Sequence, residues 1–315
     1  MLNVSRVTLW AVSGAALLAA AVLTLLGLGE NPDALPNWQA LILGLVQGLT
    51  ELLPVSSSGH LILVPWLGDW QYLKEHDAFN QTFDVALHLG TLVAVVGYFW
   101  RDLVVLVGAW FRTLRTRRIE TAEERIAWFV FVATIPAALV GAALEDPISN
   151  HLGEPWQIAI FLAVFGVVLW YADRQPEQQA MGDLGLKAAV GMGLAQCLAL
   201  MPGVSRSGIT ISAGRLFGLD RDSAARFSFL LLVPIVLGAV LLKGVKDVLL
   251  GDLPPGSTGP FVVGTLAAAG SGLLAISALL GYVRKHDYSV FVAYRLLTAT
   301  IVLLLIATGV RGAGF

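Results

Sequence analysis

Charged residues are scarce in this sequence of 315 residues. They make up 13% of the chain, whereas soluble globular domains carry about a quarter, and this deficit excludes a water-soluble domain. The 20 basic and 22 acidic residues nearly balance, so no positive excess predicts nucleic-acid binding. The sequence has one cysteine, Cys197, in an apolar run. A single thiol excludes a disulfide framework and argues against a metal–thiolate site; a small buried apolar residue is the simpler interpretation.

Apolar residues are abundant instead. Hydrophobic residues make up 57% of the chain, and the mean hydropathy is +0.76. Seven stretches are long enough to cross about 30 Å of hydrocarbon as helices. They cover residues 7–28, 83–108, 126–144, 156–172, 224–248, 261–283 and 289–310. The sequence therefore predicts an all-α polytopic membrane protein.

The first apolar stretch permits two interpretations. Residues 7–28 follow Arg6 and are rich in alanine, as in a secretory signal peptide, but the run is long and Gly27 to Asn31 is a poor cleavage site. We favour a retained transmembrane helix within an N-terminal extension, residues 1–37. A single membrane-embedded domain, residues 38–315, follows.

An internal duplication organises this domain. Residues 44–60, GLVQGLTELLPVSSSGH, overlay residues 193–209, GLAQCLALMPGVSRSGI, when the sequence is slid by 149 positions. Eight of the seventeen positions are identical, whereas unrelated apolar segments share about one or two. The mismatches are informative, because Glu51 faces Leu200, Ser57 faces Arg206 and His60 faces Ile209. Two copies of one scaffold thus carry different ionisable groups.

Both copies are too polar and too broken for a single clean span. Residues 39–67 and 187–218 contain proline, glycine and serine in their middle, which predicts two half-helices joined by a tip. Irregular backbone at membrane depth persists only where protein or a polar cavity surrounds it, so we expect two re-entrant helical hairpins. Each repeat then has a hairpin and three spans. Because three is odd, the repeats, residues 38–172 and 187–311, must have inverted topology, with the two tips facing each other.

Loop charge predicts the orientation. Basic residues cluster after the span at 83–108, and three later pairs fall on the same side, which the positive-inside rule makes cytoplasmic. They are Arg112, Arg115, Arg117, Arg118 and Arg125, then Arg174 with Lys187, Arg215 with Arg221, and Arg284 with Lys285. The loops 145–155 and 251–260 contain no lysine or arginine and are expected outside.

The tips are suited to binding an anion. A half-helix that begins at Ser56 or Ser205 points its free N–H groups and its positive dipole end at the midplane. Two such ends cradle an anion, and phosphate is the usual one. Arg206 is costly near mid-membrane, and its planar fork matches phosphate oxygens. The alternative role for Arg206 is a structural ion pair with Glu51.

Glu51, Ser57 and His60 are the candidate reacting groups. A carboxylate in apolar surroundings can move protons or hold a divalent cation, and His60 lies one helical turn from Ser57. His60 could therefore activate Ser57 as a nucleophile; a role for Ser57 as a phosphate ligand is equally open. For Ser56 and Ser58 we prefer helix capping.

Two further positions carry weaker signals. Asp84 and His88 share a helix face and line either the entrance or the membrane interface. Arg295, inside the last predicted span, is expected by default to snorkel to the cytoplasmic boundary.

These motifs closely resemble those of the undecaprenyl-pyrophosphate phosphatases of the bacitracin-resistance type. The resemblance runs in order from about residue 40 to 310 and includes GLTELLPVSSSGH, FWR at 99–101, IPAALVG at 135–141, QCLALMPGVSRSGITISAG at 196–214 and FSFLLLVP at 227–234. It implies a catalytic domain that converts undecaprenyl diphosphate to the monophosphate, recycling the lipid carrier of peptidoglycan synthesis. It also implies a bacterial cytoplasmic membrane protein whose site opens to the periplasmic side.

The family's motifs assign roles to positions of this chain. Catalytic roles are expected for Glu51, Ser57, His60 and Arg206, with Glu51 as a ligand of a divalent cation, Mg²⁺ or Ca²⁺. The residues expected to bind the substrate are Gln47, Ser56, Ser58, Gly59, Gly203, Ser205, Ser207 and Gly208. Gln47 departs from the pattern, because many members have glutamate there, and this leaves one carboxylate for the cation.

Two other functions fit parts of the sequence. Inverted repeats with broken helices are typical of transporters, so a polyprenyl-phosphate flippase is the alternative. A non-catalytic lipid-binding scaffold would explain the anion site but not Glu51 with His60. The expected partners are the polyprenyl diphosphate and membrane lipids; the oligomeric state stays open, with a homodimer as the candidate.

Overall fold

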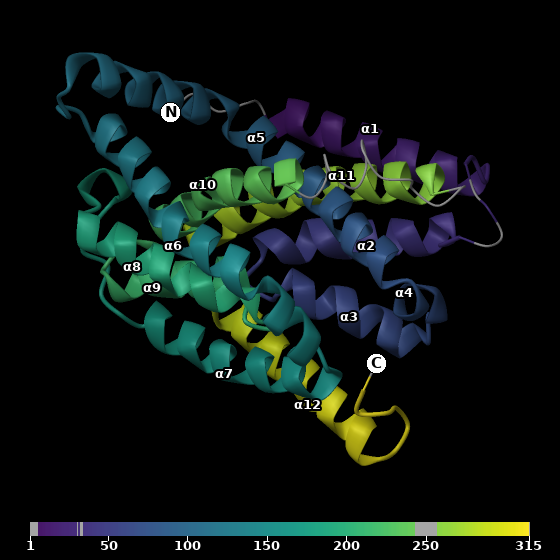
Figure 1. Ribbon diagram of the computed structural model, residues 1–315. Helices are drawn as coiled ribbons and strands as arrows, with labels where there is room; N and C mark the ends of the chain where they lie inside the picture. Colours follow the sequence, from purple (N-terminus) through teal and green to yellow (C-terminus); the bar gives the residue numbers. More distant parts are fainter. Residues whose placement is uncertain (1–5, 30, 32–33, 243–256, 315) are drawn as a thin grey trace.

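The computed structural model describes residues 6–29, 31, 34–242 and 257–314, and its regular elements are helices (Figure 1). The first repeat contains α2 (Asn37–Leu52), α3 (Ser57–Gly68), α4 (Gln71–Glu75), α5 (Asp77–Thr116), α6 (Ala122–His151) and α7 (Pro155–Asp173). The second contains α8 (Leu186–Cys197), α9 (Arg206–Leu216), α10 (Arg221–Ala239), α11 (Thr258–Val283) and α12 (Ser289–Ala307). The helix α1 (Arg6–Leu25) precedes both, and the 3₁₀ turns η1 (Met181–Asp183) and η2 (Leu198–Leu200) flank α8.

Seven of the described helices are long and apolar enough to cross a membrane, which confirms the polytopic membrane fold. They are Val7–Leu25, Phe79–Thr116, Ala122–Leu144, Pro155–Asp173, Arg221–Leu242, Thr258–Val283 and Ser289–Ala307. Each overlaps one predicted span; the end of the predicted span 224–248 lies outside the described residues. The main difference is α5, whose 40 residues make it about 60 Å long, well beyond the hydrocarbon thickness. It continues into the basic segment that the sequence assigned to a loop and ends at Thr116, before Arg117 and Arg118.

Both predicted breaks are present. The first separates α2 from α3 and the second separates η2 from α9. In each broken helix pair, α2 with α3 and α8 with α9, the two helices pack side by side. The two pairs enter the molecule from opposite ends and meet near its middle (Figure 1). This arrangement is the one expected for inverted repeats. The depth of the pairs in a bilayer stays a prediction.

The repeats interleave. The helix α2 of the first repeat packs on α11 of the second, and α8 of the second packs on α6 of the first. Small residues make both contacts close: a Cβ on Gly44 would lie 2.4 Å from the Gly264 carbonyl oxygen, and one on Gly193 would lie 2.4 Å from that of Ala133. Small residues at helix interfaces are the usual means of close packing in membranes. The first half-helix of each broken pair, α2 or α8, thus packs closely on the opposite repeat.

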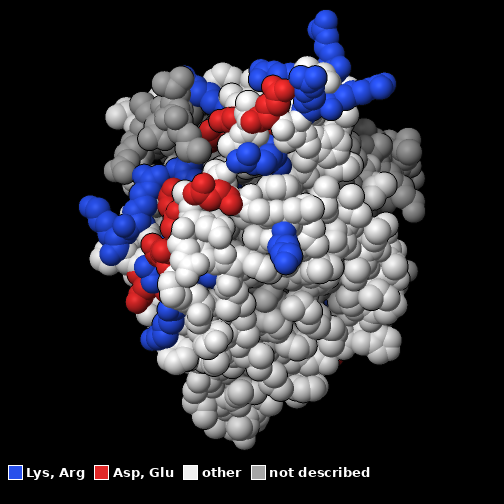
Figure 2. Space-filling model, turned by 90° about the vertical axis from the view of Figure 1, so that its left-hand side faces the viewer, with Lys and Arg blue, Asp and Glu red and all other residues white. Residues whose placement is uncertain are grey.

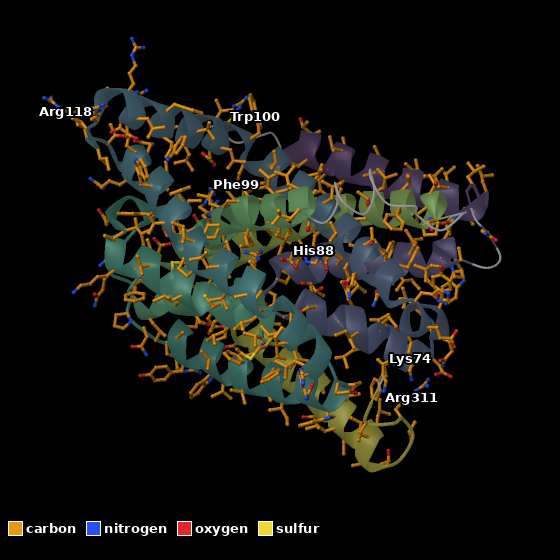
Figure 3. All side chains as sticks on the ribbon, in the orientation of Figure 1. Lys74, His88, Phe99, Trp100, Arg118 and Arg311 are labelled. Atoms are coloured by element: carbon orange, nitrogen blue, oxygen red, sulfur yellow. The ribbon has the colours of Figure 1, made fainter. Side chains whose placement is uncertain are left out.

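Charged side chains gather at one end of the molecule. Figure 2 looks onto the left-hand side of Figure 1 and shows Lys, Arg, Asp and Glu crowded over part of that face. Contacts among helix ends and turns join the charged residues at this end, since Arg125 donates to the Gly182 carbonyl and Arg221 donates to Asp173. The predicted gathering of the basic loops on one side is therefore observed. Figure 3 places Arg118 at this end and Lys74 and Arg311 at the other.

The N-terminal helix α1 lies against α11 (Figure 1). The contact is close, because a Cβ on Gly270 of α11 would lie 2.8 Å from Leu17. The retention of this helix, which we favour from the sequence, stays a prediction.

Candidate active site

Each half-helix after a break begins with a capping serine. Ser56 caps α3 and its hydroxyl accepts the Gly59 N–H at 3.4 Å; Ser205 caps α9 and accepts the Gly208 N–H at 3.1 Å. Both serines have left-handed backbone, with φ of 77° and 76°. Such conformations cost a non-glycine residue about 1–3 kcal/mol and cluster at functional sites. The capping role preferred for Ser56 is confirmed, and the duplication extends to backbone geometry.

The two tips contact each other directly. The Gly203 N–H of the second tip donates to Ser56 Oγ at 3.1 Å, and the Ser207 hydroxyl donates to the Leu53 carbonyl at 3.0 Å. Gly203 has φ of 99°, and a Cβ there would lie 2.9 Å from the Ile158 carbonyl oxygen, so the position requires glycine. The facing tips predicted from the duplication are therefore present.

Glu51 is the centre of the polar cluster that the tips enclose. Its Oε1 accepts from Arg206 Nε at 3.2 Å, and its Oε2 accepts from the Ser57 hydroxyl. Gln47 Nε2 donates to Oε2 at 3.4 Å, and His88 Nε2 lies 3.6 Å from the same oxygen. These partners come from α2, α3, α5 and α9, so four helices position one carboxylate that is 5% exposed.

Arg206 uses only part of its guanidinium within the protein. Nε binds Glu51 and Nη1 donates to the Ser228 carbonyl at 2.9 Å, whereas the buried Nη2 has no hydrogen-bond partner among the described residues. A buried donor without a partner is costly, so this nitrogen calls for an acceptor from outside the protein. The ion pair with Glu51 is present, and it leaves the Nη2 amino group of the fork for an anion.

His60 does not contact Ser57 as the spacing predicted. Its Nδ1 lies 2.7 Å from the Ser56 carbonyl and its Nε2 lies 2.7 Å from the Tyr294 hydroxyl. Both ring nitrogens are therefore occupied, and Ser57 turns to Glu51 instead. In this arrangement the carboxylate, and not the imidazole, is placed to take the serine proton.

His88 belongs to the polar cluster around Glu51. Its Nδ1 lies 2.7 Å from the Asp84 carbonyl, which it binds as an N–H donor, and this directs Nε2 toward Glu51. Figure 3 shows His88 between the two ends of the molecule. The signal in the sequence was the pair of Asp84 and His88 on one helix face.

Arg295 also differs from expectation. It does not snorkel to a boundary but is fully buried, and it hydrogen-bonds the carbonyls of Pro54, Gly203 and Val204 in the two breaks. Only the distance of Arg295 from the nearest predicted membrane boundary could have signalled this role.

The residues expected to bind substrate lie together at the two tips. Ser58 Oγ is 3.5 Å from Ser56 Oγ, and Ser207 Oγ is 3.2 Å from Ser205 Oγ. Gly59 and Gly208 lie in the first turns of α3 and α9, where their N–H groups donate to the capping serines. Gln47 lies one turn before Glu51 and is fully buried.

A divalent cation fits this donor set only with help from a ligand. Among the described residues no group of three His, Cys, Asp or Glu side chains forms a metal cluster. Gln47 Oε1, however, is buried without a hydrogen-bond partner in the described structure and lies in the same cluster as the Glu51 carboxylate. Mg²⁺ is commonly held by one or two protein oxygens together with phosphate oxygens. Glu51 and Gln47 therefore suit a cation that arrives with a phosphate.

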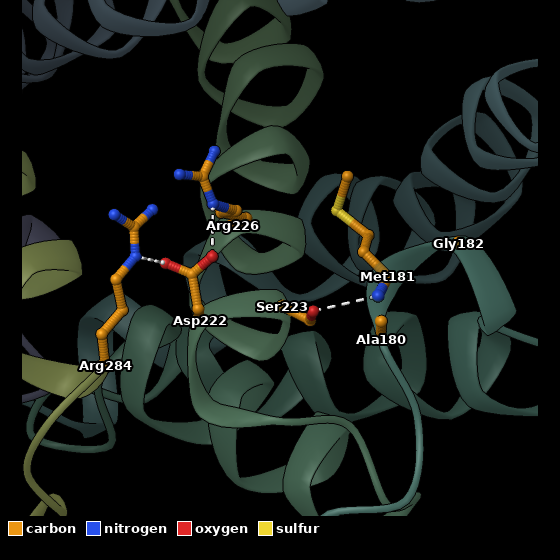
Figure 4. A pocket seen from close by; sticks show the side chains of 7 residues that line it. All are labelled: Ala180, Met181, Gly182, Asp222, Ser223, Arg226 and Arg284. Carbon is orange, nitrogen blue, oxygen red and sulfur yellow. Dashed lines mark hydrogen bonds and ion pairs between the residues drawn. The ribbon is translucent and has the colours of Figure 1, made fainter. Parts of the chain in front are cut away.

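A pocket of about 300 Å³ opens at the charged end (Figure 4). It is lined by Ala180, Met181, Gly182, Asp222, Ser223, Arg226 and Arg284. Asp222 accepts from Arg226 at 2.7 Å and from Arg284 at 2.9 Å. The pocket shares no residue with the tips, and its two arginines are already bound to a carboxylate.

Comparison with known proteins gives a consistent result. A sequence profile of the family described as "Bacitracin resistance protein BacA" matches residues 40–301. A protein of Pelotomaculum thermopropionicum named undecaprenyl-diphosphatase is 43% identical over 279 residues, covering 88% of this chain and 99% of that protein. Proteins of the same name from Thermomicrobium roseum and Geobacter metallireducens are each 46% identical, covering 86% and 85% of this chain and 98% and 97% of their own lengths. With a match of this extent, the chain belongs to the BacA family of bacitracin resistance proteins.

Proposed function

We propose that this membrane protein hydrolyses undecaprenyl diphosphate to undecaprenyl phosphate and inorganic phosphate. The reaction recycles the lipid carrier of peptidoglycan synthesis and thereby confers bacitracin resistance. The names of the relatives and the family match support this activity. The observation that carries the site is the meeting of Glu51, Ser57 and the unsatisfied nitrogen of Arg206 at two facing helix tips.

Binding follows from the charges at the tips. Arg206 Nη2 and the N–H groups at the starts of α3 and α9 bind oxygens of the diphosphate, as helix N-termini commonly bind phosphate. A divalent cation held by Glu51 and Gln47 would neutralise phosphate charge. Phosphoryl transfer depends chiefly on such positioning and charge stabilisation.

Ser57 is the proposed nucleophile. Its Oγ bonds to the terminal phosphorus while its proton passes to Glu51, and the bond from that phosphorus to the bridging oxygen breaks. Undecaprenyl phosphate leaves with the bridging oxygen. Glu51 passes that proton to the departing undecaprenyl phosphate and is a carboxylate again. Water then attacks the phosphoserine, Glu51 accepts a proton from that water and returns it to Ser57 Oγ, and inorganic phosphate departs. The hydrogen bond from Ser57 to Glu51 supports this route over one that begins at His60.

Phosphate release from undecaprenyl diphosphate by the purified protein in detergent tests the proposal. We expect release that stops when a chelator removes divalent cations. Arg206→Ala should lose about 1,000-fold or more in rate, because it removes both the phosphate fork and the partner of a buried carboxylate. Arg284→Ala, which changes an arginine at the charged end, is the matched control and should stay active. A fully active Arg206→Ala protein contradicts the site.

A flippase would give a different result. The interleaved inverted repeats are compatible with a transporter, and such a protein would move intact lipid between the leaflets of a liposome without releasing phosphate. Measuring both products in one liposome assay separates the two functions.

The proposed location is the bacterial cytoplasmic membrane, with the site open to the periplasm. The gathering of basic loops at one end supports it. A cysteine at Thr116 should be labelled only from the cytoplasm, and one at exposed Gln71 only from the periplasm. Ser257, at the predicted outer loop, is 1% exposed and unsuited to labelling.

A further inference from the structure

Arg295 on α12 is a fully buried arginine whose guanidinium faces five backbone carbonyls. Nε donates to Leu162 at 3.0 Å, Nη1 donates to Pro54 at 3.1 Å, and Nη2 lies 3.0 Å from the carbonyls of both Gly203 and Val204. A longer contact of 3.4 Å joins Nη2 to the Phe161 carbonyl. All three nitrogens of one side chain are therefore used.

The acceptors belong to both breaks. Pro54 lies in the break between α2 and α3, whereas Gly203 and Val204 lie in the break before α9. Carbonyl groups outside a helix have no partner in the helical ladder and are costly when buried from water. Arg295 satisfies carbonyls from the two breaks at once, together with Leu162 on α7.

No carboxylate accounts for this burial. Within the described residues Arg295 has no ion pair, whereas Arg215, an equally buried arginine near the charged end, pairs with Asp173 and Glu177. The Arg215 guanidinium also donates to the Leu219 and Asp173 carbonyls. The acceptors of Arg295 are thus the tips themselves.

The bound carbonyls are close in sequence to the reacting groups. Pro54 lies three residues from both Glu51 and Ser57, and Gly203 lies three residues before Arg206. Fixing these carbonyls on one rigid guanidinium fixes the separation of the first tip from the second. Lysine cannot substitute, because its ammonium is a point donor without the planar fork.

We infer that Arg295 is a positioning residue that holds the two tips in register for phosphoryl transfer. This role rests on the proposed phosphatase reaction, because the register matters only if Ser57 and Arg206 act on one phosphate. Misplacement of reacting groups by about 1 Å costs about 100-fold in rate.

The test compares Arg295→Lys with the matched control Arg215→Lys. Both variants shorten a buried arginine that binds several carbonyls, but only the first touches the tips. For Arg295→Lys we expect kcat to fall about 50-fold or more, with KM for undecaprenyl diphosphate changed less than about 5-fold. Arg215→Lys should keep kcat within about 3-fold of the unmodified protein, even if its melting temperature falls equally.

Hydrogen exchange supplies a readout that does not depend on activity. In Arg295→Lys the amides of Gly203 and Val204 should exchange about 10-fold faster than in the unmodified protein, and in Arg215→Lys they should not. If the unmodified protein releases no phosphate, the proposed function fails, and the exchange data still decide whether Arg295 holds the tips.

Three results overturn the inference: Arg295→Lys with kcat within about 3-fold of the unmodified protein, unchanged exchange at the second tip, or an equal loss of kcat in Arg215→Lys. If Arg295→Lys does not fold, Arg295→Gln provides two amide donors without charge. It should then show the same split between kcat and KM and the same local exchange.

Discussion

The two broken helix pairs share the same backbone geometry at their tips but carry different side chains. Ser56 and Ser205 share a left-handed conformation and the same capping bond, yet the next residue is a serine in the first pair and an arginine in the second. Glu51 in the first pair corresponds to Leu200 in the second. The duplication thus preserved the geometry that presents N–H groups to an anion, and divergence supplied the charged side chains.

Charge explains why the copies had to diverge. Two copies of the first tip would bring two buried carboxylates together without a cation, and two copies of the second would bring together two guanidinium groups. One copy of each instead gives the ion pair of Glu51 with Arg206 at 3.2 Å. A buried charge is tolerated when it is paired, so the asymmetry is what allows both groups to be buried.

Replacing Ser57 is the strongest way to break this asymmetry within the first tip. Ser57→Ala should lower kcat at least about 100-fold, because it removes the nucleophile and the donor to Glu51. Ser13→Ala, which changes a serine of α1 whose hydroxyl donates to the Leu9 carbonyl, is the control and should leave kcat unchanged. Rapid acid quench of the unmodified protein should trap phosphate on Ser57; active Ser57→Ala protein and no trapped phosphate would assign the attack to water.

Matched glycine substitutions test whether the scaffold is symmetric. Gly44→Ala and Gly193→Ala each bring a methyl group to 2.4 Å from a carbonyl oxygen of the opposite repeat. Each should lower the free energy of unfolding by about 1–3 kcal/mol, measured by thermal denaturation in detergent. Gly97→Ala has nothing within 4 Å of the new Cβ and is the control. A large effect from one glycine alone would contradict the symmetric packing.

Gln47 and Gln196, which occupy equivalent positions in the two repeats, provide a further test. Gln47 donates to Glu51, whereas both side-chain amide atoms of Gln196 are buried without partners among the described residues. Gln47→Leu should lower kcat about 10-fold, or about 1.4 kcal/mol, while Gln196→Leu should keep the activity and leave stability equal or higher. Equal losses of phosphate release in the two variants would show that the second glutamine also serves the site.

The smallest expected effect concerns His60, which has Ile209 as its counterpart. Tyr294→Phe removes the hydroxyl that lies 2.7 Å from His60 Nε2. A single hydrogen bond is worth about 0.5–1.5 kcal/mol, so kcat/KM should fall about 3- to 10-fold. Tyr171→Phe, with an exposed ring, is the control and should have no effect. A loss as large as that of Ser57→Ala would instead place His60 in the chemistry.

The spans and the breaks could be predicted because they depend on local composition. Apolar length predicts a spanning helix, and proline, glycine and serine within an apolar run predict a break. The inverted topology is a prediction that follows from counting spans. The ends of α5 could not be predicted in this way, since its basic last turns are as compatible with helix as with loop.

The contacts within the site were harder to predict from the sequence. Spacing placed His60 near Ser57, but the histidine instead binds Tyr294, 234 residues away, and a pattern along one helix cannot show such a partner. Arg295 and His88 were misjudged or left open for the same reason. Their partners are fixed by how α12 and α5 are rotated against the tips, which depends on packing across the whole bundle.

Interleaving also constrains how the chain can be built. The close partner of α2 is α11, which begins at Thr258, roughly 200 residues after α2 ends at Leu52. Ribosomes add about 5–20 residues per second, so the first tip waits on the order of 10 seconds or more before its neighbour is made. During synthesis its serines and glutamate must be sheltered by water, the insertion machinery or early helices. Biogenesis should therefore be most sensitive to mutations in α11, the late helix that completes the first half.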